Sequence, residues 1–340
     1  MTTLYVNKQG ASVNRLGERI EVSWYEKASQ RKQVLATQPV RDLEQLVLYG
    51  NVQLTTPAAA LLLRHDVHVI FLGRYGDYRG TLLHQGSKFA RLRHRQLLLS
   101  SRSDEMRQVA VQIVRAKLRH QRDLLQTLAE QVGSQSAGAL QAAAQGIEQM
   151  RKACPSAGTL DAVRGFEGKG SAFYFGGMRT LLDKSWSFER RAYYPPPDPF
   201  NALLSFGYGL LRKDIEATAH LVGLDPYLGC LHEMEMSRPS LVLDLMEEFR
   251  PLLVDRATLD LVLGEKITPA EFTFTGRQDR PVELGEKLLP LVINAYETRS
   301  SDLVLHGPSQ MQNTIRRCFE LQARIYARVI MGERQEYEGV

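Results

Sequence analysis

Three carboxylates stand inside the apolar run SLVLDLMEEF, and their type and spacing could hold a positive group. If the run is helical, Asp244, Glu247 and Glu248 share one face, because they are three and four residues apart. Like charges at this spacing repel one another, and each buried carboxylate destabilises the fold unless something positive compensates it. The run therefore predicts a counter-charge, supplied either by Arg238 or Arg250 or by a divalent metal ion, which prefers oxygen ligands.

A histidine precedes this run and could add a nitrogen ligand. His232 ends the segment GLDPYLGCLH, only a short loop away from the acids. Carboxylates together with a histidine favour Mg²⁺ or Mn²⁺, whereas a zinc site would need more cysteines than Cys230 alone. A histidine that is simply hydrogen-bonded in a core or on the surface is the alternative interpretation.

A fourth acid lies in a glycine-rich stretch. Glu167 stands in RGFEGKG, where Gly165, Gly168 and Gly170 allow the backbone to approach a ligand or a neighbouring helix closely. The stretch has neither the GxxxxGK[ST] pattern nor a preceding strand, so a phosphate-binding loop is not supported. A simple turn is the alternative to a functional role.

Basic residues gather between residues 88 and 122. This stretch holds ten lysines and arginines and only two acids, Asp104 and Glu105. A nucleic-acid backbone favours such an excess, because each neutralised phosphate releases counterions. A solvated helix face is the other explanation.

The elements that must position these residues change type along the chain. Up to residue 87 the runs TLYV, RIEVSW, LVLY, NVQL and VHVIFL predict short strands, with a helix at TPAAALLLRH. From Lys88 onwards the apolar spacing is helical, and we expect helices over residues 103–131, 137–153, 201–222, 240–249 and 309–331, with a hairpin at ITPAEFTFTGRQDRPVEL. The predicted fold is α+β, with a small β-rich domain over 1–87 and a large all-α domain over 88–340.

Composition sets broad limits on the class of protein. The chain has 340 residues, of which 44% are hydrophobic, and its net charge is +5. We see no signal peptide and no uninterrupted apolar run long enough for a membrane helix. The three cysteines are far apart, which favours neither a disulfide framework nor zinc. We therefore expect a soluble, cytoplasmic protein.

Several segments together resemble one family, the CRISPR-associated endonucleases that integrate new spacers. The matching stretches, in chain order, are YGNVQLTTPAAALLL, AKLRHQRDLL, GFEG, NALLSFGY, GLDPYLGCLH, RPSLVLDLMEEFRP and LQARIYARVI. No single stretch is specific, but the ordered set is, and it covers essentially the whole chain.

The resemblance implies a metal-dependent DNA endonuclease and integrase with a helical catalytic domain. Carried over by position, its metal ligands are Glu167, His232 and Glu247, with Asp244 as an accessory catalytic acid, and the metal is Mg²⁺ or Mn²⁺. The third ligand is aspartate in some members. One departure is His120, where many relatives are expected to have asparagine.

The resemblance also implies partners. These are double-stranded DNA (the protospacer and the CRISPR repeat), a second copy of the chain joined through the β-rich domain, and the small dimeric bridging subunit of the adaptation complex, with no membrane. We expect DNA contacts from two helices, and the candidate residues are Arg115, Lys117, Arg119, Arg122, Arg316, Arg317, Arg324 and Arg328. The alternatives are a non-catalytic nucleic-acid-binding scaffold, whose acids pair with arginines, and a structure-specific repair nuclease.

Overall fold

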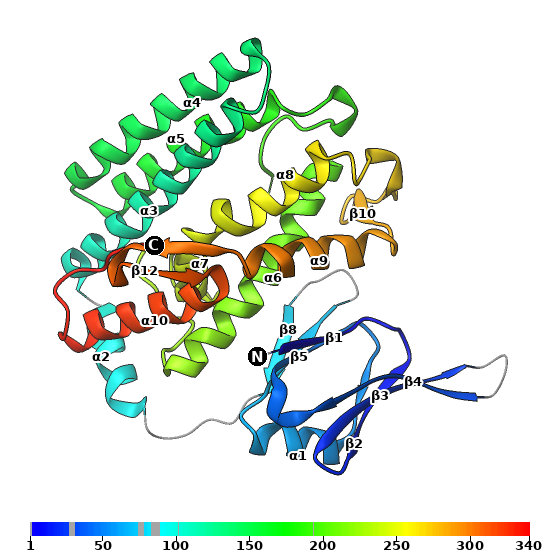
Figure 1. Cartoon of the computed structure of the whole chain (residues 1–340). Helices are drawn as coiled ribbons and strands as arrows, with labels where there is room; N and C mark the ends of the chain where they lie inside the picture. Colours follow the sequence, from blue (N-terminus) through cyan, green and yellow to red (C-terminus); the bar gives the residue numbers. More distant parts are fainter. Residues whose placement is uncertain (1, 27–30, 74–77, 83–88, 101, 193) are drawn as a thin grey trace. The chain divides into compact units, whose positions relative to one another are not determined.

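A computed structural model describes the chain except for residues 1, 27–30, 74–77, 83–88, 101 and 193. The chain divides into two compact units, Met1–Ser87 and Lys88–Val340. The first unit is rich in strands and the second is mostly helical (Figure 1), which confirms the predicted α+β class. Lys88 and the expected boundary beside it lie outside the described residues.

The first unit is built from two four-stranded sheets and one helix. One sheet has the order β1-β5-β7-β8 and the other β4-β3-β2-β6. The strands are β1 (Thr2–Val6), β2 (Ala11–Leu16), β3 (Arg19–Glu26), β4 (Arg31–Pro39), β5 (Leu43–Tyr49), β6 (Gln53–Leu54), β7 (His68–Leu72) and β8 (Tyr78–Leu82), and the helix is α1 (Thr56–Arg64). Their apolar side chains form one core, which includes Val13, Leu46, Leu61 and Val69.

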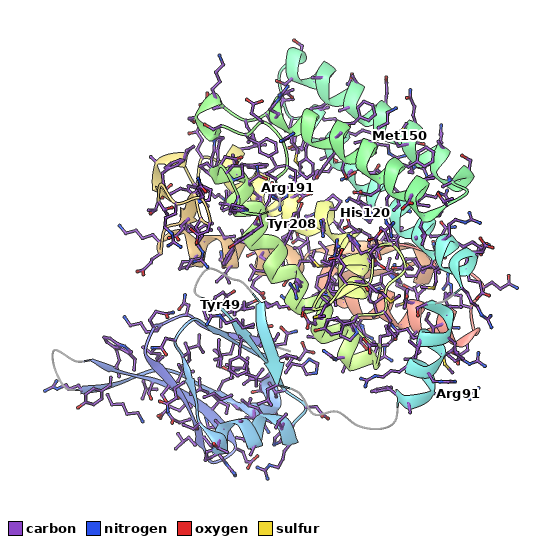
Figure 2. All side chains as sticks on the ribbon, turned by 180° about the vertical axis from the view of Figure 1, so that it is seen from behind. Tyr49, Arg91, His120, Met150, Arg191 and Tyr208 are labelled. Carbon is purple, nitrogen blue, oxygen red and sulfur yellow. The ribbon has the colours of Figure 1, made fainter. Side chains whose placement is uncertain are left out.

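The second unit begins with α2 (Ala90–Ser100) and a layer of three long helices. These are α3 (Ser103–Ala129), α4 (Ser134–Ala153) and α5 (Leu160–Arg179), which pack side by side (Figure 1). The layer is followed by α6 (Pro199–Val222), whose start is capped by the Asp198 side chain. Tyr208 on α6 is one of the buried tyrosines of this unit (Figure 2).

The acidic run forms the end of one helix and the start of a wider turn. Helix α7 covers Ser240–Met246, a π-helical segment covers Arg250–Asp255, and α8 covers Arg256–Leu263. The π segment begins at Arg250 with Pro251 next, and proline cannot donate the backbone hydrogen bond that a regular α-helix needs. Glu247 and Glu248 therefore lie at the transition from the α-helix to the π-helical segment. Such π segments are frequently found at functional sites.

The remainder of the chain shows where helical spacing misled the prediction. The hairpin β9 (Phe272–Phe274) and β10 (Val282–Leu284) is confirmed, and α9 (Leu288–Ser300) follows it. The last helix was predicted too early, because β11 (Leu303–His306) pairs with β12 (Met311–Thr314), and α10 (Ile315–Met331) starts only after this hairpin. The second unit is therefore mostly helical but not all-α. None of the described helices combines the length and apolar character that a membrane crossing demands.

Candidate active site

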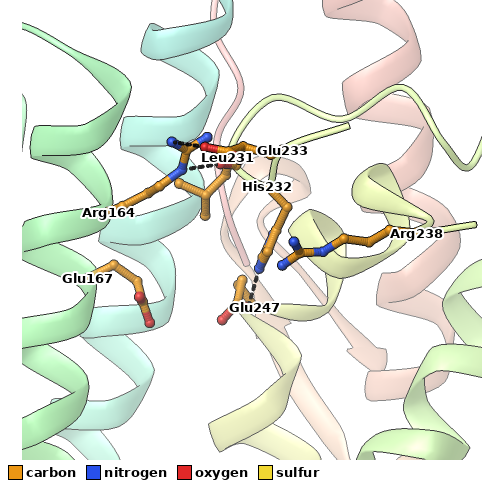
Figure 3. A pocket seen from close by; sticks show the side chains of 7 residues that line it. All are labelled: Arg164, Glu167, Leu231, His232, Glu233, Arg238 and Glu247. Carbon is orange, nitrogen blue, oxygen red and sulfur yellow. Dashed lines mark hydrogen bonds and ion pairs between the residues drawn. The ribbon is translucent and has the colours of Figure 1, made fainter. Parts of the chain in front are cut away.

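Four of the residues singled out in the sequence converge on one region of the helical unit. Glu167, His232 and Glu247 line a pocket of about 280 Å³, together with Arg164, Leu231, Glu233 and Arg238. Glu167 comes from α5 on one wall, and His232 and Glu247 come from the opposite wall (Figure 3). Asp244 lies behind His232 and is completely buried.

Glu167 lies in the middle of a helix, so the interpretation of RGFEGKG as a turn was wrong. Helix α5 starts after Thr159, whose side chain caps it by accepting from the Ala162 N–H. The carboxylate of Glu167 accepts a hydrogen bond of 2.9 Å from the Ser171 hydroxyl one turn later. A helical position fixes the direction of the side chain more firmly than a flexible loop would.

A lysine lies between the two pocket carboxylates. The Lys117 ammonium pairs with Glu167, and it lies 2.5 Å from Oε2 of Glu247. Only 7% of the Lys117 side chain is exposed. Burial disfavours its charge, but the two carboxylates outweigh burial and raise the pKa of Lys117 above its ordinary value. This ammonium is therefore a counter-charge that local spacing could not predict, because Lys117 is 50 residues from Glu167 in the chain.

Glu247 is ionised although it is buried. Burial favours its neutral form, but the positive charges of Arg250 and Lys117, and of His232 when it is protonated, lower the pKa of Glu247 to about 2. Arg250 lies 3.3 Å from Oε1 of Glu247, so one of the two arginines expected from the sequence does supply positive charge. Arg238 pairs instead with Glu235 on the surface and lines the pocket.

Asp244 orients the histidine and the loop that carries it. Its carboxylate accepts from the backbone N–H groups of Cys230, Leu231 and His232, and it lies 2.7 Å from Nδ1 of His232. A carboxylate can only accept, so the neutral ring carries its proton on Nδ1 and leaves the Nε2 lone pair free. That Nε2 atom lies 3.7 Å from Oε1 of Glu247. Asp244 thus acts on the pocket through His232.

The close approach of this loop to α7 depends on a glycine. A side-chain carbon at Gly229 would lie 2.5 Å from Oδ2 of Asp244 and 2.6 Å from the backbone of Ser240. Only glycine fits without moving one of these groups. The sequence offered a weak signal for this position, since Gly229 lies just before Cys230 in the segment that leads to His232.

The donor types in the pocket fit Mg²⁺ or Mn²⁺. The carboxylates of Glu167 and Glu247, together with an imidazole held by a third carboxylate, Asp244, are suitable ligands for these ions. The buried Oε2 atom of Glu247 meets Lys117 as an ion pair and accepts no hydrogen bond of good geometry from the described residues. Within the described part of the chain, no three acid, histidine or cysteine side chains gather closely enough to form a preassembled metal site. In this arrangement the Lys117 ammonium occupies the space between the carboxylates.

The third acid of the run, Glu248, does not line the pocket with Glu247. Glu248 is completely buried and accepts hydrogen bonds from Gln322, Tyr337 and the backbone N–H of Val340. Burial raises the pKa of Glu248, and these donors oppose that rise. The acids of the run therefore do not form one stripe.

The predicted DNA-contacting residues have different environments. On α3, Arg122 pairs with Glu148 at 2.7 Å, Arg115 bonds to Gln112, and Arg119 is half-buried, which lowers its pKa. On α10, Arg316 turns inward to Asp214 and Glu297, whereas the exposed residues are Arg317, Arg324 and Arg328. Lys117 is buried against Glu167 and Glu247. DNA contact by these residues stays a prediction, and the exposed α10 arginines are the best placed for it.

We predict that Lys117 is essential for stability when no metal is present. Lys117→Met should leave two carboxylates without their shared cation and lower the free energy of unfolding by about 3–5 kcal/mol. Lys152→Met is the matched control, because Lys152 is 72% exposed and its pair with Glu148 should contribute less than about 0.5 kcal/mol. Urea unfolding in EDTA measures both values, and equal losses would contradict the role given to Lys117.

A second prediction concerns the loop before His232. Gly229→Ala should destabilise the protein by roughly 1–3 kcal/mol, because the added carbon must push against Asp244 and Ser240. Gly138→Ala is the control, since Gly138 lies in α4 with open space around it. That change should stabilise the helix by about 0.5–1 kcal/mol. Urea unfolding again gives the comparison, and a neutral Gly229→Ala would show that the loop is not closely packed.

Comparison with known proteins identifies the family. The family model described as CRISPR associated protein Cas1 matches residues 4–298. The CRISPR-associated endonuclease Cas1 1 of Moorella thermoacetica is 32% identical over 303 residues, which are 88% of each chain.

Two solved structures have the same fold as this chain. A casposase bound to integration product has a TM-score of 0.84 at 20% identity and covers 99% of this chain and 93% of its own. A Cas6-RT-Cas1–Cas2 complex has a TM-score of 0.81 at 21% identity and covers 100% of this chain and 36% of its own. These two matches show the fold alone, while the family model and the Moorella relative show the family: the chain belongs to the Cas1 family of CRISPR-associated proteins.

Proposed function

We propose that this protein is a metal-dependent DNA endonuclease and integrase that inserts protospacer DNA into a CRISPR repeat. The observation that carries the proposal is the meeting of Glu167, His232 and Glu247 in one pocket, with the imidazole oriented by Asp244. Two names support it, since the Moorella relative is called an endonuclease and the casposase was solved with its integration product.

Glu167, His232 and Glu247 would hold Mg²⁺ or Mn²⁺. When bound, the ion would supply stabilisation of negative charge on the attacking and leaving oxygens of an in-line displacement at phosphorus. The low pKa of Glu247 keeps this carboxylate ready to bind a cation at neutral pH. The Asp244 carboxylate keeps the proton of the neutral His232 ring on Nδ1, so that Nε2 remains a donor atom toward the pocket.

The same centre can serve two reactions that differ in the nucleophile. In integration, the 3′-hydroxyl of the protospacer attacks a repeat phosphodiester and displaces the 3′-oxygen of the cut strand. With water as the nucleophile, the displacement is hydrolysis and the protein acts as an endonuclease. Lys117 keeps positive charge within the pocket in either case, beside the acids that face the phosphate.

The partners follow from the same proposal. The helical unit would act on double-stranded DNA, and the strand-rich unit 1–87 would join two copies of the chain. The small bridging subunit is the proposed protein partner, which the Cas1–Cas2 complex among the structural matches supports by its name.

One observation favours a different function, that of a non-catalytic scaffold. Lys117 and Arg250 already neutralise the pocket acids, as expected for a non-catalytic scaffold that binds nucleic acid without metal. That reading predicts no Mn²⁺ binding and no cleavage of branched DNA. A repair nuclease would cleave branched DNA but would not integrate a protospacer together with the small subunit.

We predict that integration depends on the pocket acids. Glu167→Gln and Glu247→Gln should each reduce strand transfer by more than the roughly 10–100-fold typical of residues that only support a metal ligand, and EDTA should abolish it. Glu189→Gln is the control, because Glu189 is 82% exposed and pairs with Arg179 on the surface. The assay follows a labelled protospacer into a repeat-bearing plasmid. Full activity of the Glu167→Gln variant or in EDTA would contradict the proposal.

DNA affinity should fall steeply with salt. Each phosphate contact contributes a slope of about −0.9 to the dependence of log K on log salt, so losing one contact should reduce the slope by about one unit. We expect this change for Arg328→Gln on the exposed side of α10, and no change for Arg179→Gln at the end of α5. Fluorescence anisotropy at several salt concentrations gives the slopes, and a salt-independent affinity would argue against binding through the phosphate backbone.

A further inference from the structure

We infer that residues 333–340 position the metal-binding acid Glu247. They do so by hydrogen-bonding to the neighbouring carboxylate of Glu248, which does not line the pocket. The inference rests on the proposed function, because it assumes that Glu247 binds metal. These residues follow α10 and run back toward α3, where Figure 1 marks the end of the chain. Most of them are charged or polar, and nothing in the sequence ERQEYEGV predicts this role.

The Glu248 carboxylate is the centre of the contact. The Tyr337 hydroxyl donates to Oε1 at 2.5 Å, and the Val340 N–H donates to Oε2 at 2.9 Å. The Gln322 amide on α10 also donates to Oε1, at 3.0 Å. Glu248 is fully buried and Tyr337 is 1% exposed, so these hydrogen bonds are made away from water. Loss of one donor would leave part of a buried carboxylate unsatisfied, which is costly.

Helix α3 completes the contact through His120 (Figure 2). Its Nδ1 atom lies 2.8 Å from the backbone oxygen of Glu248, and its Nε2 atom lies 3.0 Å from the backbone oxygen of Val340. A neutral imidazole has one donor, so it can bond to only one of these two acceptors at a time. The ring nevertheless joins α3, the turn after α7 and residues 333–340 at one point.

A close approach of backbones shows that this packing is tight. A side-chain carbon at Gly339 would lie 2.3 Å from Cβ of Ala116 and 2.8 Å from Oε2 of Glu248. Ala116 is adjacent to Lys117, the cation that pairs with Glu167 and Glu247. Residues 333–340 therefore contact both α3 and the turn that holds Glu247 and Glu248, which we call the acidic turn. Both contacts are made by residues next in sequence to the paired charges, since Ala116 precedes Lys117 and Glu248 follows Glu247.

Consecutive side chains of the acidic turn are thus held in different directions. Glu247 faces the pocket, and Glu248 faces residues 333–340. If Glu248 loses its donors, the turn can rotate, and Glu247 moves relative to Glu167 and His232. Tyr337 is accordingly a positioning residue, which acts on Glu247 through Glu248 without touching the substrate.

The chain offers two matched controls for Tyr337→Phe, which removes only the hydroxyl that Glu248 accepts from. Tyr326 packs edge-on against Tyr337, and its buried hydroxyl has no hydrogen-bond partner among the described residues. The Tyr296 hydroxyl donates to the buried carboxylate of Asp214 at 2.7 Å, which repeats the tyrosine–carboxylate chemistry at a carboxylate other than Glu248. Tyr326→Phe therefore controls for aromatic packing, and Tyr296→Phe controls for general loss of stability.

The experiment measures Mn²⁺ affinity by calorimetry and hydrogen exchange of residues 244–250 without metal, on the full chain. We expect Tyr337→Phe and Gly339→Ala to weaken Mn²⁺ binding by about 10-fold and to speed exchange of this segment. Tyr326→Phe and Tyr296→Phe should leave both readouts at the wild-type values. Wild-type affinity and wild-type exchange in Tyr337→Phe would overturn the inference.

The two hypotheses fail in different ways. If the wild-type protein binds no Mn²⁺, the proposed function fails, and exchange of residues 244–250 in Tyr337→Phe still tests the positioning contact. If the wild type binds Mn²⁺ but Tyr296→Phe weakens binding as much as Tyr337→Phe, the effect is general destabilisation, and the positioning role is refuted.

Discussion

The pairing of one buried lysine with two acids is the interaction on which the pocket depends. Lys117 on α3 joins Glu167 on α5 to Glu247 at the end of α7, so one ammonium ties together three separate elements. Removing water from two carboxylates is unfavourable, and no packing of apolar side chains could compensate for it. The same pairing makes the pocket suitable for a cation, because it helps to keep Glu247 ionised and holds both acids toward a common space.

Around this interaction, hydrogen bonds fix the direction of each acid in the run. Asp244 accepts from three backbone N–H groups of the loop that carries His232, and Glu248 accepts from residues on the opposite side. Glu247 lies between these two well-anchored carboxylates. Consecutive side chains on a helical turn point roughly 100° apart, so Glu247 and Glu248 can meet partners on different sides of the same turn.

Much of the fold was predictable from local sequence patterns. Alternating and continuous apolar runs identified β1, β3, β5, β6 and β7, and helical spacing identified most of α3, α4 and α6. Strand β4 escaped because most of it is exposed, so it lacks the alternation that marks a half-buried strand. Strand β12 was mistaken for the start of α10, since its register depends on pairing with β11 and not on its own residues.

The site was only partly predictable, because several of its interactions join residues that are far apart in the sequence. Residue type and spacing singled out Glu167, His232, Asp244 and Glu247, the family resemblance implied their roles, and the structure brings them together. The roles of Lys117 and Glu248 were not foreseen, because their partners are 50 to 130 residues away for Lys117 and 74 to 92 residues away for Glu248. Spacing along one helix could suggest only that the acids needed compensation.

The most direct measurement of the central claim is anomalous diffraction from crystals of the protein grown with Mn²⁺. The account predicts one manganese peak bound by Glu167, His232 and Glu247, with the Lys117 ammonium displaced from between the carboxylates. A crystal saturated with Mn²⁺ that shows no peak in this pocket, with Lys117 still joining the two acids, would contradict it.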